Sequence, residues 1–324
     1  MTYATLGLSV VLAVFATVTV LVSLVLALAW PAFAWAAGAA PAAARARLLL
    51  ALRALPAVVG AAVALVLASR AWLGFEPKQS SESPGALLVV LAAAGLLLLL
   101  AAVRRAWVSW RAGRDLARRW VSEGHALALP GVDLPTYRIT HPWPVVCVVG
   151  TLRPRLFVAE AVLQSCTREE LSSVLAHEVG HVAARDNLKR LVFKLLPDVV
   201  SALPSGRALE KQWEGASEAA ADARAAGTRP GAALDLAAAL VRVARLAARG
   251  TWVPLPARAL LDGASVAPRV ERLLEAGPAP RGRARLALAW AALLALPVAV
   301  LLASEQPSVL RGVHQAAELV VHAR

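Results

Sequence analysis

Two histidines separated by three residues, with a glutamate directly after the first, are the side chains of this sequence best suited to chemistry. They are His177, Glu178 and His181, in the run HEVGH. On a helix, residues four apart project from one face, so both imidazoles could bind a single Zn²⁺. Glu178 could then act as general base on a zinc-activated water, which is the chemistry of peptide hydrolysis. Because so short a pattern also occurs by chance, its surroundings decide the interpretation.

A catalytic zinc site needs a third protein ligand and one open position. Glu218 is the downstream candidate, in an Ala-rich segment that is predicted to be helical over residues 217–227. Asp222 shares a helix face with Glu218 and could accept a hydrogen bond from a ligand histidine, fixing its orientation. Glu214 is a nearby competitor, and an exposed helix carboxylate is the ordinary alternative for each of these residues.

The segment before the HEVGH run carries its own helix-start signal. Thr167 and Glu170 have the spacing of a capping box, and apolar residues then recur at helical intervals. The pattern predicts a helix that extends to about Ala184 and holds both histidines on one face.

Two β-rich runs precede that helix, at residues 145–149 and 156–158, and a turn rich in Gly and Pro separates them. This pattern predicts a hairpin. Val146 and Val148 are candidate substrate-binding residues, because an extended peptide could add to the hairpin as a further strand.

The composition places the chain among membrane proteins. Of 324 residues, 59% are apolar, and the mean hydropathy is +0.62. Lys and Arg outnumber Asp and Glu by 34 to 21, a net charge of +13. With no concentrated basic helix face and no interleaved aromatic residues, we expect anionic lipid and not nucleic acid as the partner of this charge. Cys147 and Cys166 are too few for a disulfide framework or a cysteine zinc site.

Four apolar stretches predict an α-helical polytopic membrane protein with a soluble domain between its third and fourth spans. The first stretch lacks the basic start and short apolar centre of a cleaved signal peptide, so we interpret it as a retained helix. A polar loop is predicted over residues 71–84. Three transmembrane helices are predicted within region 1–103, at about 5–30, 54–70 and 86–103. The soluble domain is predicted over 104–285, the fourth transmembrane helix over 286–304 and a short tail over 305–324.

The arginines next to these spans predict the orientation. Positive residues follow the first and third spans and precede the fourth, which places the domain on the cytoplasmic side of a bacterial cytoplasmic membrane. The N-terminus and the tail then lie outside. His314 and His322 belong to that tail, so neither is expected to be the third zinc ligand. No oligomeric state is predicted.

Three segments together resemble a known family. Residues 170–186, ELSSVLAHEVGHVAARD, resemble the HExxH helix of the BlaR/MecR-type membrane metallopeptidases. Residues 150–158 are similar to the hairpin before that helix, residues 218–222 match the family's ExxxD helix, and the order of spans is also similar. The resemblance implies an α+β gluzincin-like domain with Zn²⁺ as cofactor and Glu218 as third ligand. It also implies that Asp222 accepts a hydrogen bond from a ligand histidine.

The chain also departs from that family. Only residues 305–324 follow the last span, so we expect no β-lactam sensing by an outer penicillin-binding domain. Ala221 stands where those proteins often have Cys, and Ala is more usual in the related HtpX and CAAX-prenyl-protease group. Asp186 matches a position that is often acidic in the family, with no firm role.

The leading hypothesis is a membrane zinc endopeptidase that cuts a cytoplasmic or membrane-proximal protein, and the resemblance implies a transcriptional repressor as a substrate. An HtpX-like quality-control or processing peptidase is the alternative with the same chemistry. A catalytically silent sensor or scaffold is the alternative of another class, and the intact zinc-site residues argue against it. A structural membrane protein with a chance HExxH is disfavoured by the three motifs in order.

Overall fold

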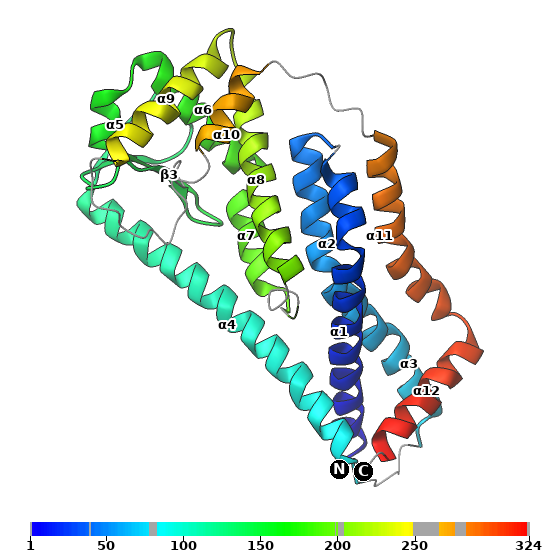
Figure 1. Cartoon of the computed structure of the whole chain (residues 1–324). Coiled ribbons are helices and arrows are strands. Elements are labelled where there is room, and N and C mark those ends of the chain that lie inside the picture. Colours follow the sequence, from blue (N-terminus) through cyan, green and yellow to red (C-terminus); the bar gives the residue numbers. More distant parts are fainter. Residues whose placement is uncertain are drawn as a thin grey trace.

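The computed structural model describes residues 2–38, 40–77, 83–197, 199, 204–248, 266–275 and 283–322. Among these, four helices are long and apolar enough to cross a membrane. They are α1 (Tyr3–Gly38), the continuous helix formed by α2 (Ala42–Ala62), η1 (Val63–Ala68) and α3 (Ser69–Phe75), then α4 (Ala86–Glu123) and α11 (Arg283–Ala303). The elements between α4 and α11 gather at one end of this helical region as an α+β domain (Figure 1).

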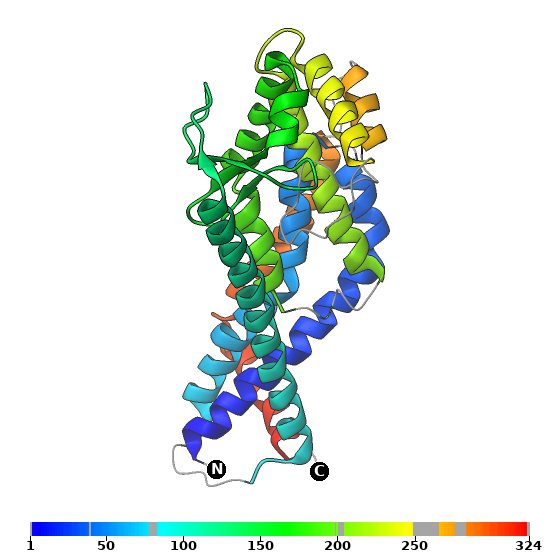
Figure 2. The same cartoon turned by 90° about the vertical axis from the view of Figure 1, so that its left-hand side faces the viewer.

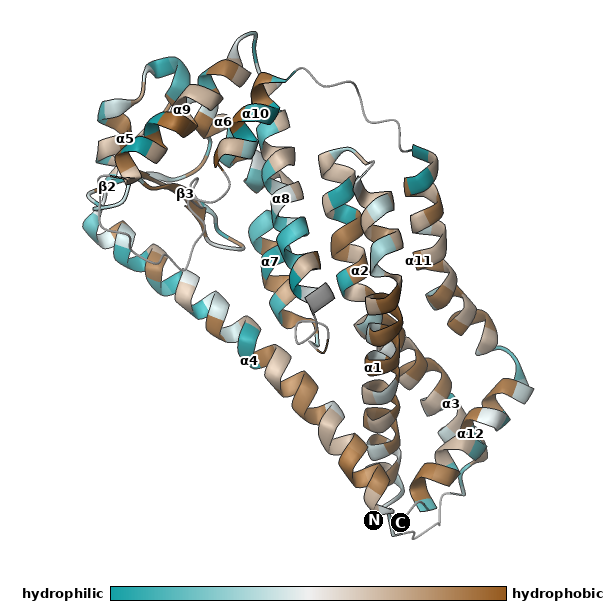
Figure 3. Cartoon of the chain, viewed as in Figure 1, coloured by the Kyte–Doolittle hydropathy of each residue, from teal (hydrophilic) through white to brown (hydrophobic). Residues whose placement is uncertain are grey.

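Hydropathy divides the molecule along its length. The apolar residues are concentrated on the parts of α1, α4 and α11 that lie away from the α+β domain (Figure 3). The predicted fold class, an α-helical polytopic membrane protein with an α+β domain, is therefore confirmed.

Two of the helices extend well beyond the predicted spans. The second was expected to start near residue 54, but its helix starts at Ala42, because Ala, Leu and Arg are strong helix formers and no Gly or Pro interrupts the segment before Pro56. Arg45 and Arg53, expected near the ends of a connection, consequently lie on the helix. Arg53 is 6% exposed, and its Nη1 donates to the carbonyl of Pro197 over 3.4 Å. This end of α2 therefore packs against the domain.

The predicted polar loop is only partly within the described residues, and its first part is helical as far as Phe75. The third span continues as the same helix to Glu123. Its second half forms a wall of the α+β domain (Figure 1). Near its start α4 crosses α1 (Figure 2), and a Cβ on Gly95 would collide with the carbonyl oxygen of Leu12. The glycine thus permits the close approach of two membrane helices.

The predicted tail contains a helix, α12 (Pro307–His322), that packs against α3. Just before it, Oε1 of Glu305 lies 2.9 Å from Nη1 of Arg70. Nε2 of His314 lies 3.9 Å from Oε2 of Glu76. Both chain ends lie at the end of the molecule opposite the α+β domain (Figure 1).

The domain's sheet has the strand order β1-β2-β4-β3. The predicted hairpin is confirmed, because β3 (Val146–Val149) pairs antiparallel with β4 (Arg155–Ala159). Gly150 begins the turn with φ 110°, and a Cβ there would lie 2.5 Å from the carbonyl oxygen of Arg153, so the turn requires glycine. The strands β1 (His125–Ala126) and β2 (Thr136–Ile139), which were not predicted, complete the sheet, with β2 parallel to β4.

The sheet lies between α4 on one side and α6 on the other (Figure 1). The ring of Trp120, from α4, packs edge-on against Phe157 of β4 at 5.2 Å between centroids. Val174 of α6 and Leu240 of α9 are fully buried in the same core. The domain helices are α5 (Glu160–Ser165), α6 (Arg168–Ala184), α7 (Asp186–Leu195), α8 (Pro204–Ala226), α9 (Ala232–Ala247) and α10 (Val266–Leu274).

Candidate metal centre

The helix that carries HEVGH begins as its sequence predicts. The hydroxyl of Thr167 accepts from the Glu170 amide over 3.2 Å, and the Glu170 carboxylate accepts from the Thr167 amide over 2.9 Å. Arg242 of α9 also donates to both oxygens of Glu170, at 2.9 and 3.0 Å. This capping box ties the start of α6 to α9, and α6 ends at Ala184 as expected.

Three side chains from two helices converge on one point. Nε2 of His177 lies 3.1 Å from Nε2 of His181. Glu218 of α8 places Oε2 at 3.5 Å from His177 and Oε1 at 3.5 Å from His181. Donor atoms held about 2.0–2.1 Å from a tetrahedral zinc ion stand about 3.3 Å apart. The three side chains form a group that could hold a metal ion, and both the spacing and the N, N, O donor set suit zinc.

Small residues let α8 approach α6 closely enough to deliver Glu218. A Cβ on Gly180 would lie 3.5 Å from the Cα of Ala221, and Ala221 is 2% exposed. Arg224, further along α8, donates to the carbonyl oxygen of Gly180. Ala221, the residue that differs from the BlaR/MecR pattern, therefore lies where α6 and α8 cross.

Each histidine has a carboxylate beside its other ring nitrogen. Oδ1 of Asp222 lies 2.9 Å from Nδ1 of His177, in the position that the sequence suggested. Oδ2 of Asp186 lies 2.8 Å from Nδ1 of His181. These contacts orient both rings with Nε2 toward Glu218.

Asp186 had no predicted role. A reversal of the backbone between α6 and α7 places it beside His181. Arg185 has the left-handed conformation, with φ 55° and ψ 40°, which ends α6 and starts α7. The hydroxyl of Ser217 donates to Asp186 over 2.7 Å, and Lys189 donates over 3.0 Å. Burial alone would raise the pKa of Asp186, but the hydrogen bonds from His181, Ser217 and Lys189 lower it to about 2.

The surroundings of the histidines are negative enough to favour a cation. Burial would lower the pKa of His181, but Asp186 and Glu218 raise it to about 9. The pKa of His177 is also raised, because Asp222 and Glu218 outweigh burial. The same carboxylates would stabilise a divalent ion between the rings.

Arg269 of α10 is a member of the site that sequence reasoning missed. It is 2% exposed and donates to both oxygens of Asp222, at 3.0 and 2.7 Å. Its Nη1 lies 3.3 Å from Oε2 of Glu218. Burial would lower the pKa of Arg269, but Asp222 raises it above its ordinary value. No motif near residue 269 signals this contact, which depends on how α10 packs.

Glu178 faces the edge strand. The residue is 4% exposed, and its Oε2 accepts from the Val148 amide over 3.1 Å. Burial raises the pKa of Glu178, with only partial compensation from His177 and His181. A buried carboxylate with a raised pKa, next to two candidate ligands, suits a general base.

The predicted substrate-binding strand is at the edge of the sheet, but its outer side is covered. Val146 and Val148 are 0% and 8% exposed. Asn187 of α7 donates to the carbonyl oxygens of Val148 and Gly150, at 3.0 and 3.1 Å. A peptide that paired with β3 at Val148 would therefore have to replace the contacts of Glu178 and Asn187.

Comparison with known proteins identifies the class of the domain. Residues 148–253 match the model of Peptidase family M48, and this segment contains both helices of the candidate centre. The match supports a peptidase domain of the gluzincin type over this part of the chain.

One relative gives a closer likeness. Over 95 residues the chain is 34% identical to a protein described as Protease HtpX homolog, from Archaeoglobus fulgidus; the match spans 29% of this chain and 28% of that protein. No solved structure matches the chain. The comparisons support the membrane metallopeptidase interpretation but do not single out the BlaR/MecR-type group.

Proposed function

We propose that the protein is a membrane-embedded, zinc-dependent endopeptidase that hydrolyses peptide bonds of a cytoplasmic or membrane-proximal protein. The convergence of His177, His181 and Glu218 within 3.1–3.5 Å carries the proposal. Zinc held by these residues would supply a Lewis acid that polarises the scissile carbonyl and acidifies a water. Among the residues that the structure describes, Glu178 is the further carboxylate beside these ligands that is suited to accept and return a proton.

Each of the neighbouring residues then has a distinct role in hydrolysis. Glu178 removes a proton from the attacking water and returns it to the leaving amine, so that the carboxylate ends the cycle as it began. The Val148 amide fixes the position of that carboxylate, over 3.1 Å. Asp222 and Asp186 hold the two imidazoles in the tautomer that leaves Nε2 free to bind.

An HtpX-like processing or quality-control role is supported by the likeness to a protein described as Protease HtpX homolog. Cleavage of a transcriptional repressor is the second candidate, and the order of three spans, domain and fourth span favours it. The two roles differ in substrate: fragments of membrane proteins would support the first, and a DNA-binding protein the second. A catalytically silent sensor or scaffold is the remaining alternative.

We also propose the predicted orientation, with domain 104–285 on the cytoplasmic side of a bacterial cytoplasmic membrane and both chain ends outside. Arginines at the domain end of α2 and α4 support it, since cytoplasmic flanks are rich in Lys and Arg.

Zinc content tests the proposed function first. The detergent-purified wild type should hold stoichiometric zinc by elemental analysis, and His177→Ala and Glu218→Ala should lose it. Glu214→Ala is the matched control, because Glu214 is on the same helix but outside the group of converging ligands. Absence of zinc from well-folded wild type would reject the peptidase. Zinc retention without cleavage of any disordered protein would support the silent sensor.

A further inference from the structure

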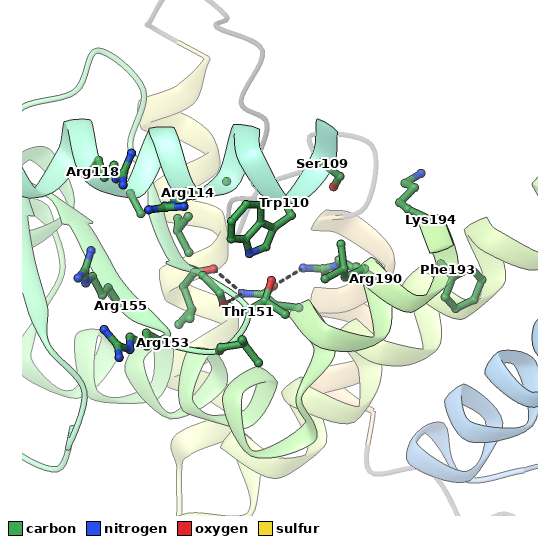
Figure 4. A pocket seen from close by; sticks show the side chains of 18 of the residues that line it. Ser109, Trp110, Arg114, Arg118, Thr151, Arg153, Arg155, Arg190, Phe193 and Lys194 are labelled. Carbon is green, nitrogen blue, oxygen red and sulfur yellow. Dashed lines mark hydrogen bonds between the residues drawn. The ribbon is translucent and has the colours of Figure 1, made fainter. Parts of the chain in front are cut away.

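A large cavity lies beside the candidate metal centre. Its volume is about 770 Å³, and it is bounded by α4, the β3–β4 turn, α7 and α8 (Figure 4). Cations line it from three sides: Arg114, Arg118, Arg153, Arg155, Arg190 and Lys194. Its lining includes two carboxylates, Glu210 and Glu214. The cavity is therefore a concave and strongly positive site.

Much of this positive charge is not neutralised by the chain itself. Lys194 is paired with Glu210 at 3.1 Å, and Nη1 of Arg118 lies 3.9 Å from Oδ1 of Asp115. Within the described part of the chain no carboxylate lies within ion-pair distance of Arg153 or Arg155. Arg114 lies over the ring of Trp110, 5.2 Å from its centroid, a contact that does not neutralise the guanidinium. A cleft lined by positive charges raises the local concentration of anions.

The cavity reaches the candidate catalytic residues at one end of β3. Val148, which donates to Glu178, is part of its wall. Arg190 is also part of the wall, and its Nη2 lies 3.9 Å from Oε1 of Glu218. Residues of the cavity wall therefore contact two carboxylates of the candidate metal centre, so a polypeptide bound at that centre would have the cavity within reach of its side chains.

We propose that this cavity binds acidic side chains of the substrate polypeptide, on one side of the scissile bond. The inference rests on the proposed function and names the substrate class. The selectivity falls on one side only, because the cavity opens at the Gly150 end of β3 and not at the other. Its wall residues Val148 and Arg190 contact Glu178 and Glu218, and this closeness to the candidate metal centre favours a peptide over a lipid headgroup as the occupant.

Peptide binding to the full-length Glu178→Gln protein tests this, in nanodiscs of phosphatidylcholine alone. The probes are fluorescent peptides in which Ala alternates with Asp, Ser or Lys, followed by anisotropy. The Asp peptide should bind about 10-fold more tightly than the Ser peptide, with a preference that weakens as salt is added. Adding Arg114→Gln and Arg118→Gln should reduce the preference about 3- to 10-fold, as expected for two partly exposed charge contacts.

The matched control is the pair Arg111→Gln and Arg119→Gln, which removes the same charge from the same helix outside the cavity. It should leave the preference unchanged. Equal binding of the Asp and Ser peptides, or an equal loss in both double variants, would overturn the proposal. Absence of peptide binding, with binding of short-chain phosphatidylglycerol that only the cavity variant loses, would assign the cavity to lipid. Because the assay needs no turnover, failure of the peptidase function would appear separately, as absent zinc or absent cleavage.

Discussion

Oδ2 of Asp186 lies 2.8 Å from Nδ1 of His181, so the first residue of α7 orients a candidate zinc ligand five positions earlier. The backbone reversal at Arg185 allows this contact. Ser217, on the helix that carries Glu218, donates a hydrogen bond to Asp186 and so holds its carboxylate in place. The turn between α6 and α7 is therefore part of the metal centre.

Asp186→Asn should weaken zinc binding about 10- to 100-fold, because an amide orients the imidazole less well and does not raise its basicity. Asp222→Asn should do the same through His177. Competition against a chromophoric chelator measures the affinity. Asp235→Asn is the control, since Asp235 pairs with Arg229, at 2.6 Å, away from the site. Unchanged zinc affinity in both site variants would contradict the role of Asp186 and Asp222 in orienting the histidines.

Glu178→Gln should lower peptidase activity about 10²- to 10⁴-fold, because the amide cannot act as a base. Zinc content should stay as in wild type, since Glu178 is expected not to bind the metal. The amide oxygen can still accept from Val148, so the local fold is preserved. Glu169→Gln, an exposed change on the same helix, should keep full activity. Loss of zinc from the Glu178 variant would make this residue a ligand and contradict the assignment.

The parts of the site that sequence reasoning reached are local. The capping box of Thr167 and Glu170 and the hairpin turn at Gly150 depend on residues a few positions apart, and so does the shared face of His177 and His181. The four apolar helices follow from composition alone. Their ends were placed less well, because Ala and Arg continue a helix beyond the hydrocarbon core without any signal in hydropathy.

The parts that it missed depend on tertiary packing. Arg269 reaches the site from α10, and its apolar neighbours have no functional pattern. The strand β2 has only four residues and pairs in parallel with a strand that follows it in the sequence, so no hairpin signal marks it. The covered outer edge of β3 likewise depends on Asn187, whose residue type is common in turns.

Cys166 reports on the folded state around the start of α6. Burial and the neighbouring Glu170 raise the pKa of its thiol from 9.0 to about 11. In a Cys147→Ala background, iodoacetamide should therefore modify the native protein about 100-fold more slowly than the unfolded chain near pH 8, because thiolate is the reactive form. Between pH 9 and about 11 the folded thiol keeps a proton that the unfolded thiol releases, so this group should make the domain less stable as pH rises through that window. Equal alkylation rates before and after unfolding would contradict the partly buried position of Cys166.

Reporter fusions test the orientation in the membrane. Alkaline phosphatase, which is active only outside the cytoplasm, should be active when fused after Phe75 or at the C-terminus, and inactive after Glu123. The physical reason is that arginines flank the domain ends of α4 and α11, and such flanks stay on the cytoplasmic side. The opposite pattern of activities would reverse the proposed topology and place the metal centre outside.

Arg269→Met should destabilise the domain by about 3–5 kcal/mol, because it leaves the buried Asp222 and the partly buried Glu218 without their shared cation. The loss should be larger in zinc-free protein, where no metal ion offsets the charge of Glu218. Thermal unfolding of the detergent-purified variant, with and without a chelator, measures both effects. Arg269→Lys should rescue only in part, since one ammonium cannot donate to both Asp222 oxygens in the geometry of a guanidinium.

Arg272→Met is the matched control on the same helix. Its guanidinium lies 4.0 Å from Asp222 but the side chain is 50% exposed, so its removal should cost less than about 1 kcal/mol. The combined change Arg269→Met with Asp222→Asn should recover much of the stability, because it removes an unpaired buried charge together with its partner. If Arg269→Met unfolds at the same temperature as Arg272→Met in both conditions, the buried arginine does not hold the carboxylates of the metal centre in place.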